Sequence, residues 1–349
     1  MTPQKVIIAE NLEHSLTTAV NECEHDRIFL LADETTEKLC LPIIAGFECV
    51  KEAQTITIGA TDANKTILSL SHVWEKLGQG GATRHTLLIN IGGGMVTDLG
   101  GFAASTFKRG INYINIPTTL LSMVDASVGG KTGINFNGLK NEIGVFNNAA
   151  SVILDTQFLR TMDRENILSG YAEMLKHGLI SNQTMWAELM NFDIEQPDLK
   201  ALGRMVADSV QVKQRIVLED PTEKGIRKAL NLGHTIGHAF ESFALRHTPI
   251  LHGYAVAYGL ICELYLSAVK TGFPTDKMRQ TVNFIKEHYG KMNITCDDDP
   301  TLLELMTHDK KNVGSTINFT LLGDIGDIRI NQTASKQEIY EALDFYREC

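Results

Sequence analysis

Residues 87–98 read Leu87-Leu88-Ile89-Asn90-Ile91-Gly92-Gly93-Gly94-Met95-Val96-Thr97-Asp98. A short apolar run followed by a turn and an amphipathic stretch is typical of a buried parallel strand that leads into a helix. A glycine turn at such a strand end offers free amides and the positive end of a helix dipole to a pyrophosphate. A tight packing turn explains the same glycines. Because the spacing is not G-x-G-x-x-G, the motif alone leaves both interpretations open.

Similar short runs recur along the first part of the chain, at residues 6–9, 27–32, 55–58, 113–116 and 152–154. After about residue 160 the pattern changes to longer helical segments at 165–190, 198–218, 226–244, 254–271 and 275–289, then a hairpin of 316–322 and 327–330 and a last helix. We therefore predict an α/β N-terminal Rossmann-like domain with a parallel sheet over residues 1–160. A mostly α-helical C-terminal domain follows over residues 161–349.

The composition excludes several classes of protein. The 349 residues carry 32 Lys and Arg against 42 Asp and Glu, a net charge of −10, which excludes nucleic acid and an anionic membrane surface as partners. An anionic ligand would need positive charge gathered locally. Six cysteines without a C-x-x-C pair indicate reduced thiols, and no signal peptide or membrane span is apparent, so we expect a soluble cytoplasmic protein.

A second ligand-binding pattern lies within residues 117–133. Thr118 and Thr119 follow a predicted strand, and Gly129-Gly130-Lys131-Thr132 supplies amides, a hydroxyl and one cation to a phosphorylated ligand. The last four residues look like part of a P-loop, but 123–128 contains no glycine, so nucleoside triphosphate hydrolysis is not indicated. Lys140-Asn141, taken alone, is an ordinary surface pair.

The helical half contains a carboxylate and histidines with metal-binding character. Glu173 and Lys176 lie three residues apart, on one helical face, which an exposed ion pair also explains. His234 and His238 are four apart, but the Glu of H-E-x-x-H is missing, which argues against a metalloprotease. With His252, Glu173 and His234 would form a common zinc set. Spacing alone does not select this triple among 11 histidines.

Taken together, these stretches resemble the 3-dehydroquinate synthase family of the sugar phosphate cyclases. The resemblance runs from about residue 28 to residue 330 and rests on ordered blocks: Gly92–Gly94 with Asp98, 116–133, Lys140-Asn141, Glu173 with Lys176, Lys213, Arg227 with Asn231, His234 with His238, His252-Gly253, and 309–311.

The resemblance implies a dehydroquinate synthase-like fold and an unusual use of NAD. The family converts 3-deoxy-D-arabino-heptulosonate 7-phosphate, a small sugar phosphate, into 3-dehydroquinate and phosphate. A ring hydroxyl is oxidised by hydride transfer to NAD, the new ketone acidifies the adjacent C–H, and phosphate leaves. NADH then returns the hydride, and an intramolecular aldol step closes the ring.

The resemblance also implies roles for individual residues. Glu173, His234 and His252 would bind Zn²⁺, with Co²⁺ as an alternative. His238 would lie beside the metal or relay a proton, and Asp125 would orient the reacting hydroxyl. The carboxylate and phosphate of the substrate would be surrounded by Lys131, Lys140, Asn141, Lys176, Lys213, Arg227, Asn231 and Lys310, with the choice between Lys310 and Lys311 open.

For NAD, the implied contacts are Gly92, Gly93, Gly94 and Asp98 at the pyrophosphate and ribose, Thr118 and Thr119 at the nicotinamide end, Asp33, Asp62 and Lys65 near the adenosine, and additionally Asp125, Lys131 and Lys140. Family members are homodimers in which an arginine at the position of Arg109 reaches the neighbouring subunit's phosphate site. The chain departs from the family pattern at Ala60-Thr61-Asp62, usually Ala-Gly-Glu, and His252 stands two residues farther from His234.

Three other functions fit parts of the pattern. A metal-dependent polyol dehydrogenase of similar fold would not need the cations Lys131, Lys140, Lys213 and Arg227. A related cyclase acting on another sugar phosphate would share the mechanism. The sequence does not show the shape of the pocket, so it does not decide between the two substrates. An inactive NAD-binding sensor would not need the complete set of metal ligands.

Overall fold

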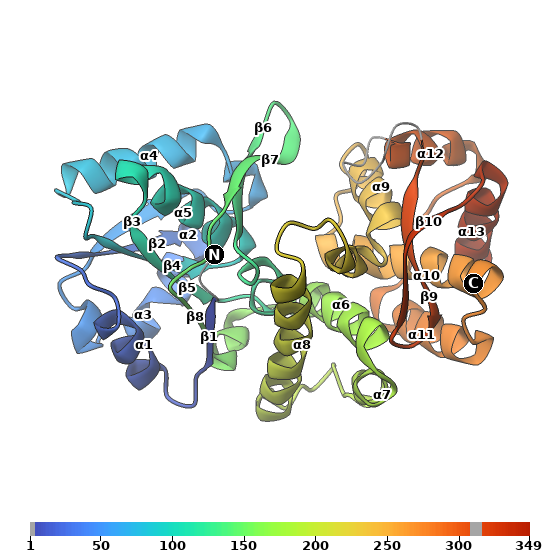
Figure 1. Ribbon diagram of the computed structural model, residues 1–349, viewed down its shortest axis with the longest axis horizontal. Coiled ribbons are helices and arrows are strands. Elements are labelled where there is room, and N and C mark those ends of the chain that lie inside the picture. Colours follow the sequence, from blue (N-terminus) through green and yellow to red (C-terminus); the bar gives the residue numbers. More distant parts are fainter. Residues whose placement is uncertain (1–3, 308–315) are drawn as a thin grey trace. The chain divides into compact units, whose positions relative to one another are not determined.

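The computed structural model describes residues 4–307 and 316–349 (Figure 1). The chain forms two compact units, one containing the described residues up to Asp163 together with Asp198–Val210, the other containing Arg164–Pro197 and the described residues from Gln211 onward. Residues 198–218 were expected in the second domain, whereas the first half of the corresponding helix belongs to the first unit.

The first unit is an α/β structure. Its strands and helices are β1 (Lys5–Ile8), α1 (Leu12–Asn21), β2 (Ile28–Asp33), α2 (Glu34–Leu39), α3 (Leu41–Ile44), β3 (Gln54–Ile58), α4 (Ile67–Gln79), β4 (Leu87–Gly92), α5 (Gly94–Thr106), β5 (Asn112–Pro117), β6 (Lys131–Phe136), β7 (Leu139–Phe146) and β8 (Ser151–Leu154), together with the start of α8 (Leu199–Glu219).

Among the described residues, six strands pair in parallel in the order β1-β8-β5-β4-β2-β3. They are the six strands expected from the sequence, so the predicted parallel sheet is confirmed. The strand order reverses between β2 and β4, because β3 lies outside β2 while β5 and β8 extend the other way. Ligands of such sheets bind beyond the carboxyl ends of the strands at this reversal. Asp33 and Gly92 end the two strands that flank it.

The antiparallel ribbon β6–β7, which the sequence analysis did not predict as a hairpin, lies beside α5 (Figure 1). Asn137 and Gly138 form its two-residue turn with φ of 50° and 78°. Asn-Gly is the preferred pair where both turn residues need positive φ. This signal was available in the sequence, and the ribbon is what carries Lys131, Lys140 and Asn141.

The second unit is mainly helical, as predicted. Its elements are α6 (Arg164–Ser181), α7 (Gln183–Asn191), the end of α8, α9 (His234–Ala244), α10 (His252–Thr271), α11 (Thr275–Tyr289), α12 (Asp299–Thr307), the antiparallel hairpin of β9 (Asn318–Asp324) and β10 (Asp327–Thr333), and α13 (Lys336–Glu348).

Two expected helices are interrupted, and one helix was missed. The segment 165–190 breaks at Asn182, whose side chain accepts a hydrogen bond from the Met185 amide and so begins α7. The segment 226–244 breaks at Gly233, which has a left-handed φ of 79°. Helix α12 was not predicted. Within the described residues, no helix combines the length and apolar character needed to cross a membrane.

The packing of α5 on the sheet predicts an unequal response to two glycine substitutions. In Gly100→Ala, the new Cβ would lie 2.1 Å from Oδ1 of the buried Asn90, so we expect a loss of about 1–3 kcal/mol of unfolding free energy. Gly78, in α4, has open space around its Cβ position, and Gly78→Ala should stabilise by about 0.5–1 kcal/mol. Urea unfolding of both variants measures the difference. Equal midpoints would contradict the close packing of α5.

Candidate active site

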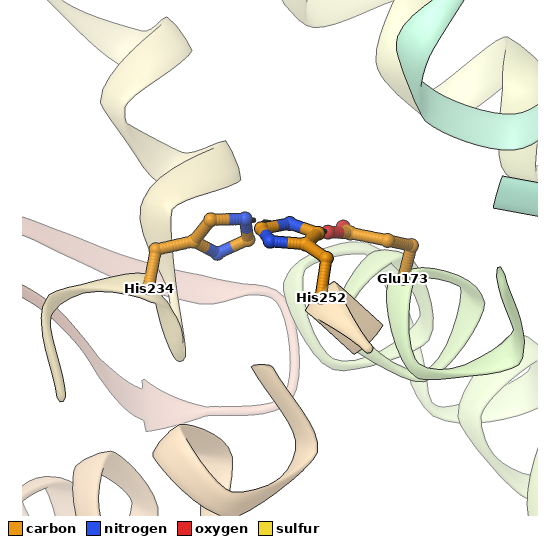
Figure 2. A group of neighbouring side chains, drawn as sticks. All are labelled: Glu173, His234 and His252. Atoms are coloured by element: carbon orange, nitrogen blue, oxygen red, sulfur yellow. Dashed lines mark ion pairs between the residues drawn. The ribbon is translucent and has the colours of Figure 1, made fainter. Parts of the chain in front are cut away.

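Three helices of the second unit bring Glu173, His234 and His252 together. Glu173 lies in the middle of α6, while His234 and His252 are the first residues of α9 and α10. Figure 2 shows the three side chains pointing toward one another. The Nε2 atoms of His234 and His252 lie 3.3 Å and 3.4 Å from the same oxygen of Glu173, Oε1. The sequence proposed this triple among many, and the structure places its ligand atoms within 4.8 Å of one another.

The other ring nitrogen of each histidine faces an acceptor. Nδ1 of His234 lies 3.1 Å from the Leu232 carbonyl, and Nδ1 of His252 lies 3.3 Å from a Glu241 carboxylate oxygen. An Nδ1 proton directed at these acceptors leaves the Nε2 lone pairs aimed at Glu173. Metal-binding histidines are usually oriented in this way by a carbonyl or carboxylate.

The residues fit a tetrahedral metal ion. Ligands about 2.0–2.2 Å from zinc at tetrahedral angles lie about 3.3–3.6 Å apart, which matches the two nitrogen–oxygen distances. Both Glu173 oxygens are fully buried, and within the described residues neither accepts a hydrogen bond of normal geometry. Two imidazole lone pairs facing one carboxylate oxygen would repel it unless a cation or a proton lies between them. The donor set thus suits Zn²⁺ or a similar ion.

Lys176 and the protein interior set the charges of this group. Burial favours a neutral Glu173 carboxyl, but Lys176, which forms an ion pair with its Oε2, and the two histidines hold the pKa of Glu173 well below its usual range. Burial lowers the pKa of His234 to about 4. Burial also opposes a charge on His252, yet Glu241 and Glu173 together raise the pKa of His252 to about 10. A metal ion would therefore replace a proton on His252.

His238 lies beside the metal triple. Its ring centroid is 5.3 Å from that of His234 and 5.9 Å from that of His252. Ligand atoms of His238, Glu241 and His252 also come within 4.8 Å of one another. The first triple suits a metal better because Glu173 is fully buried and, among the described residues, its oxygens accept no hydrogen bond of normal geometry, whereas His238 is only partly buried. Glu241 was not predicted, since a lone glutamate on a helix carries no distinguishing signal in the sequence.

Three buried cations of the second unit belong to the predicted substrate set. Lys176, Lys213 and Arg227 are 1%, 6% and 2% exposed. Such residues are almost never buried unless they serve an anion or an ion pair. Arg227 donates from Nη1 to the Pro221 carbonyl at 2.7 Å, and Asn231 donates from Nδ2 to Glu223 at 2.9 Å.

Asp220, which the sequence analysis missed, organises the loop before Arg227. Its carboxylate accepts hydrogen bonds from the amides of Lys224, Gly225 and Arg227 at 3.0, 2.6 and 3.1 Å. Burial alone would raise the pKa of Asp220, but these backbone hydrogen bonds lower it below its usual value. The loop is therefore held in one conformation by a carboxylate that stays charged.

In the first unit, several predicted cofactor and substrate residues meet at Lys65. Its Nζ lies 2.5 Å from Asp98 Oδ2 and 2.5 Å from Asn141 Oδ1, and the side chain is 3% exposed. Lys140 Nζ lies 3.9 Å from Asp62 Oδ2. The ribbon β6–β7 thus lies against the segment that follows β3, which brings these five residues together.

The glycine turn and the threonines lie where β4 and β5 end. Gly93 begins α5 without a side-chain cap, and a Cβ at Gly92 would lie 2.5 Å from Val96 Cγ2. The Thr118 amide donates to the Gly92 carbonyl at 3.0 Å, and Thr119 hydrogen-bonds with Ser122. Both interpretations of the turn therefore have support: it packs tightly, and it opens onto a helix N-terminus at the reversal of strand order.

Asp33 ends β2 and caps α2, because its Oδ1 accepts hydrogen bonds from the Thr35 and Thr36 amides at 2.8 and 2.9 Å. Asp125 is partly buried in the short helix Ser122–Ala126, and Lys131 is exposed at the start of β6. Lys310 and Lys311 lie outside the described residues.

Arg109 lies in an exposed turn of the first unit. Its φ is 72°, and that of the preceding Lys108 is 48°. Left-handed backbone at two successive non-glycine residues is uncommon and costs conformational free energy. The turn therefore presents Arg109 at the surface in a defined and unusual conformation.

Comparison with known proteins places the chain in a family. The family model described as 3-dehydroquinate synthase N-terminal matches residues 55–169, and that described as 3-dehydroquinate synthase C-terminal matches residues 170–312. The chain is 54% identical over 349 residues to a 3-dehydroquinate synthase of Parabacteroides distasonis, covering 100% of this chain and 99% of that protein.

Solved structures of similar fold include two synthases. A 2-deoxy-scyllo-inosose synthase, crystallised with carbaglucose-6-phosphate, NAD⁺ and Co²⁺, has a TM-score of 0.85 at 23% identity, covering 98% of this chain and 96% of that chain. A 2-epi-5-epi-valiolone synthase from Streptomyces hygroscopicus, with NAD⁺ and Zn²⁺, has a TM-score of 0.85 at 24% identity, covering 100% and 98%. On the two family models and the full-length identity, this chain is an enzyme that belongs to the 3-dehydroquinate synthase family.

Proposed function

We propose that this enzyme converts 3-deoxy-D-arabino-heptulosonate 7-phosphate into 3-dehydroquinate and phosphate, with NAD as a cofactor regenerated in each turnover and Zn²⁺ as its metal. The observation that carries the proposal is the convergence of Glu173, His234 and His252 beside buried Lys176. Bound NAD⁺ would supply a reversible hydride acceptor, and Zn²⁺ would supply a Lewis acid at the substrate hydroxyl.

The residues of each unit have distinct tasks in this proposal. Glu173, His234 and His252 hold the metal, and the strand ends around Gly92–Gly94, with Asp98 and Lys65, hold the dinucleotide. The remaining adenosine and nicotinamide contacts are those implied by the resemblance: Asp33, Asp62, Thr118 and Thr119.

The cations bind a substrate that carries both a carboxylate and a phosphate. The proposed set, carried over from the resemblance, is Lys131, Lys140, Asn141, Lys176, Lys213, Arg227, Asn231 and Lys310. Buried cations stabilise negative charge that develops on the departing phosphate and on an enolate oxygen, because they are already oriented before the reaction. Lys176 does so while it keeps Glu173 ionised.

Asp125 and His238 are proposed to handle protons and orientation. Asp125 orients the reacting hydroxyl. His238, whose ring lies beside those of His234 and His252, holds or relays a proton next to the metal and does not bind it. We also propose a cytoplasmic homodimer. The six cysteines are all free, the expected state in a reducing compartment, and Arg109 lies in an exposed turn suited to reach a neighbouring subunit.

The reaction itself gives the first prediction. Purified enzyme with the heptulosonate phosphate should release phosphate only when NAD and a divalent metal are present, while absorbance at the NADH band stays at baseline. The reason is that each hydride removed is returned in the same turnover. A dehydrogenase would instead accumulate NADH in proportion to product without releasing phosphate, and that outcome would refute the proposal. Phosphate release from another sugar phosphate alone would indicate a sister cyclase.

Metal content tests the ligand assignment. We expect His234→Ala to lose bound zinc, since His234 Nε2 lies 3.3 Å from Glu173 Oε1, and His238→Ala to keep most of it. Elemental analysis of the purified, dialysed variants measures the metal directly, and circular dichroism shows that both are folded. Equal loss of zinc from the two variants would show that the assignment of His238 is wrong.

Hybrid dimers test whether Arg109 acts in the neighbouring subunit. Arg109→Ala and Lys176→Ala should each be nearly inactive as homodimers. Co-expressed hybrids should regain about a quarter of the wild-type activity, because half of the dimers are hybrids and each contains one complete site. No recovery above the separate variants, with hybrid formation verified by differently tagged chains, would place Arg109 in its own subunit's site or outside any site.

A further inference from the structure

Glu263 is a buried carboxylate in α10 that lies against the start of α9. It is fully buried, and its oxygens accept three backbone hydrogen bonds. Oε2 accepts from the Gly233 amide at 2.6 Å, while Oε1 accepts from the Thr235 and Ile236 amides at 2.9 and 3.1 Å. These amides flank His234, the residue whose Nε2 faces Glu173.

The first turn of α9 has no local residue that can cap it. Its N-cap is Gly233, which has no side chain and takes the left-handed φ of 79°. Gly233, Thr235 and Ile236 are buried, so water cannot satisfy their amides. Glu263 therefore caps the N-terminus of α9 from another helix, a role that a local Ser, Asp or Asn side chain has at most helix N-termini. Its negative charge also complements the positive end of the helix dipole.

Close backbone packing brings Glu263 within reach. A Cβ on Gly259 would lie 2.0 Å from the Gly233 carbonyl oxygen, and a Cβ on Gly237 would lie 2.9 Å from the Ala255 carbonyl oxygen. The two helices thus run antiparallel with glycines at their contact. Because α10 begins with His252, one helix supplies a metal ligand directly and holds the backbone of another ligand in place.

We propose that Glu263 is a positioning residue for the metal site: its carboxylate fixes the backbone of the first turn of α9, and so fixes the imidazole of His234 relative to Glu173 and His252. The proposal rests on the metal site proposed above. Nδ1 of His234 faces the Leu232 carbonyl within the same turn, so backbone and imidazole are held together. Loss of Glu263 would release both.

The test measures metal binding rather than turnover. Full-length Glu263→Gln keeps the shape and one acceptor oxygen but replaces the other oxygen with an NH₂ group that faces backbone N–H groups. After metal removal, zinc affinity is measured by competition with a chromophoric chelator, and the visible spectrum of the Co²⁺ form reports the coordination geometry. We expect zinc to bind about 10- to 100-fold more weakly, as for other residues that orient metal ligands, and the Co²⁺ spectrum to change.

Asp299→Asn is the matched control. Asp299 is another buried carboxylate of the same unit, 5% exposed, and it pairs with Arg347 at 2.6 and 3.0 Å. This variant should lower the Tm of the metal-free protein and leave zinc affinity and the Co²⁺ spectrum unchanged. Glu263→Asp keeps the negative charge but has a side chain shorter by one methylene. If the charge of the carboxylate that faces the amides contributes, this variant should bind zinc more tightly than Glu263→Gln.

Three outcomes separate the proposals. A fall in Tm for Glu263→Gln and Glu263→Asp with wild-type zinc affinity and Co²⁺ spectrum would reduce Glu263 to a stabilising cap and overturn the inference. Weakened binding with an altered spectrum supports it. If the wild type and His234→Ala bind zinc equally, the proposed metal site is wrong, and the proposed positioning role of Glu263 is then wrong as well.

Discussion

A single buried carboxylate constrains the second unit. Glu173 is fully removed from water, Lys176 pairs with its Oε2, and two histidines face its Oε1, where a proton or a cation must lie between them and the carboxylate. Each neighbour must therefore be held in place. The Leu232 carbonyl and Glu241 orient the imidazoles, and α6, α9 and α10 must pack so that three ligands from distant parts of the chain meet.

Charge is distributed against the sign of the whole chain. The net charge is −10, yet Lys176, Lys213 and Arg227 are buried in the helical unit and Lys65 is buried in the α/β unit. Because these cations lie in an interior of low dielectric constant, their local field on an anionic ligand is far stronger than that of exposed acidic side chains screened by water. A family that acts on a phosphorylated carboxylate needs this local excess, whatever the overall charge.

Much of the architecture was predictable because it follows from local patterns. The six parallel strands, the helical second half and the β9–β10 hairpin were each expected from short apolar runs, longer helical periodicity and turn residues. The β6–β7 ribbon was missed, although Asn137-Gly138 is the preferred pair for a two-residue turn in which both residues have positive φ. The break at Gly233 was missed because a glycine inside a helical pattern does not by itself show a left-handed conformation.

Local patterns along the chain are enough to predict the class of fold and the chemistry of the donor set, and the ordered motifs are enough to predict the family. Spacing in the sequence could not select Glu173, His234 and His252, because the three residues lie on different helices. The distances that define a ligand set are those between helices, which the sequence does not show. Nor could it indicate Glu241 or Glu263, which are ordinary glutamates until α9 and α10 pack at their glycines. Only tertiary structure decides which buried amides and imidazoles a carboxylate meets, since burial removes water as the alternative partner.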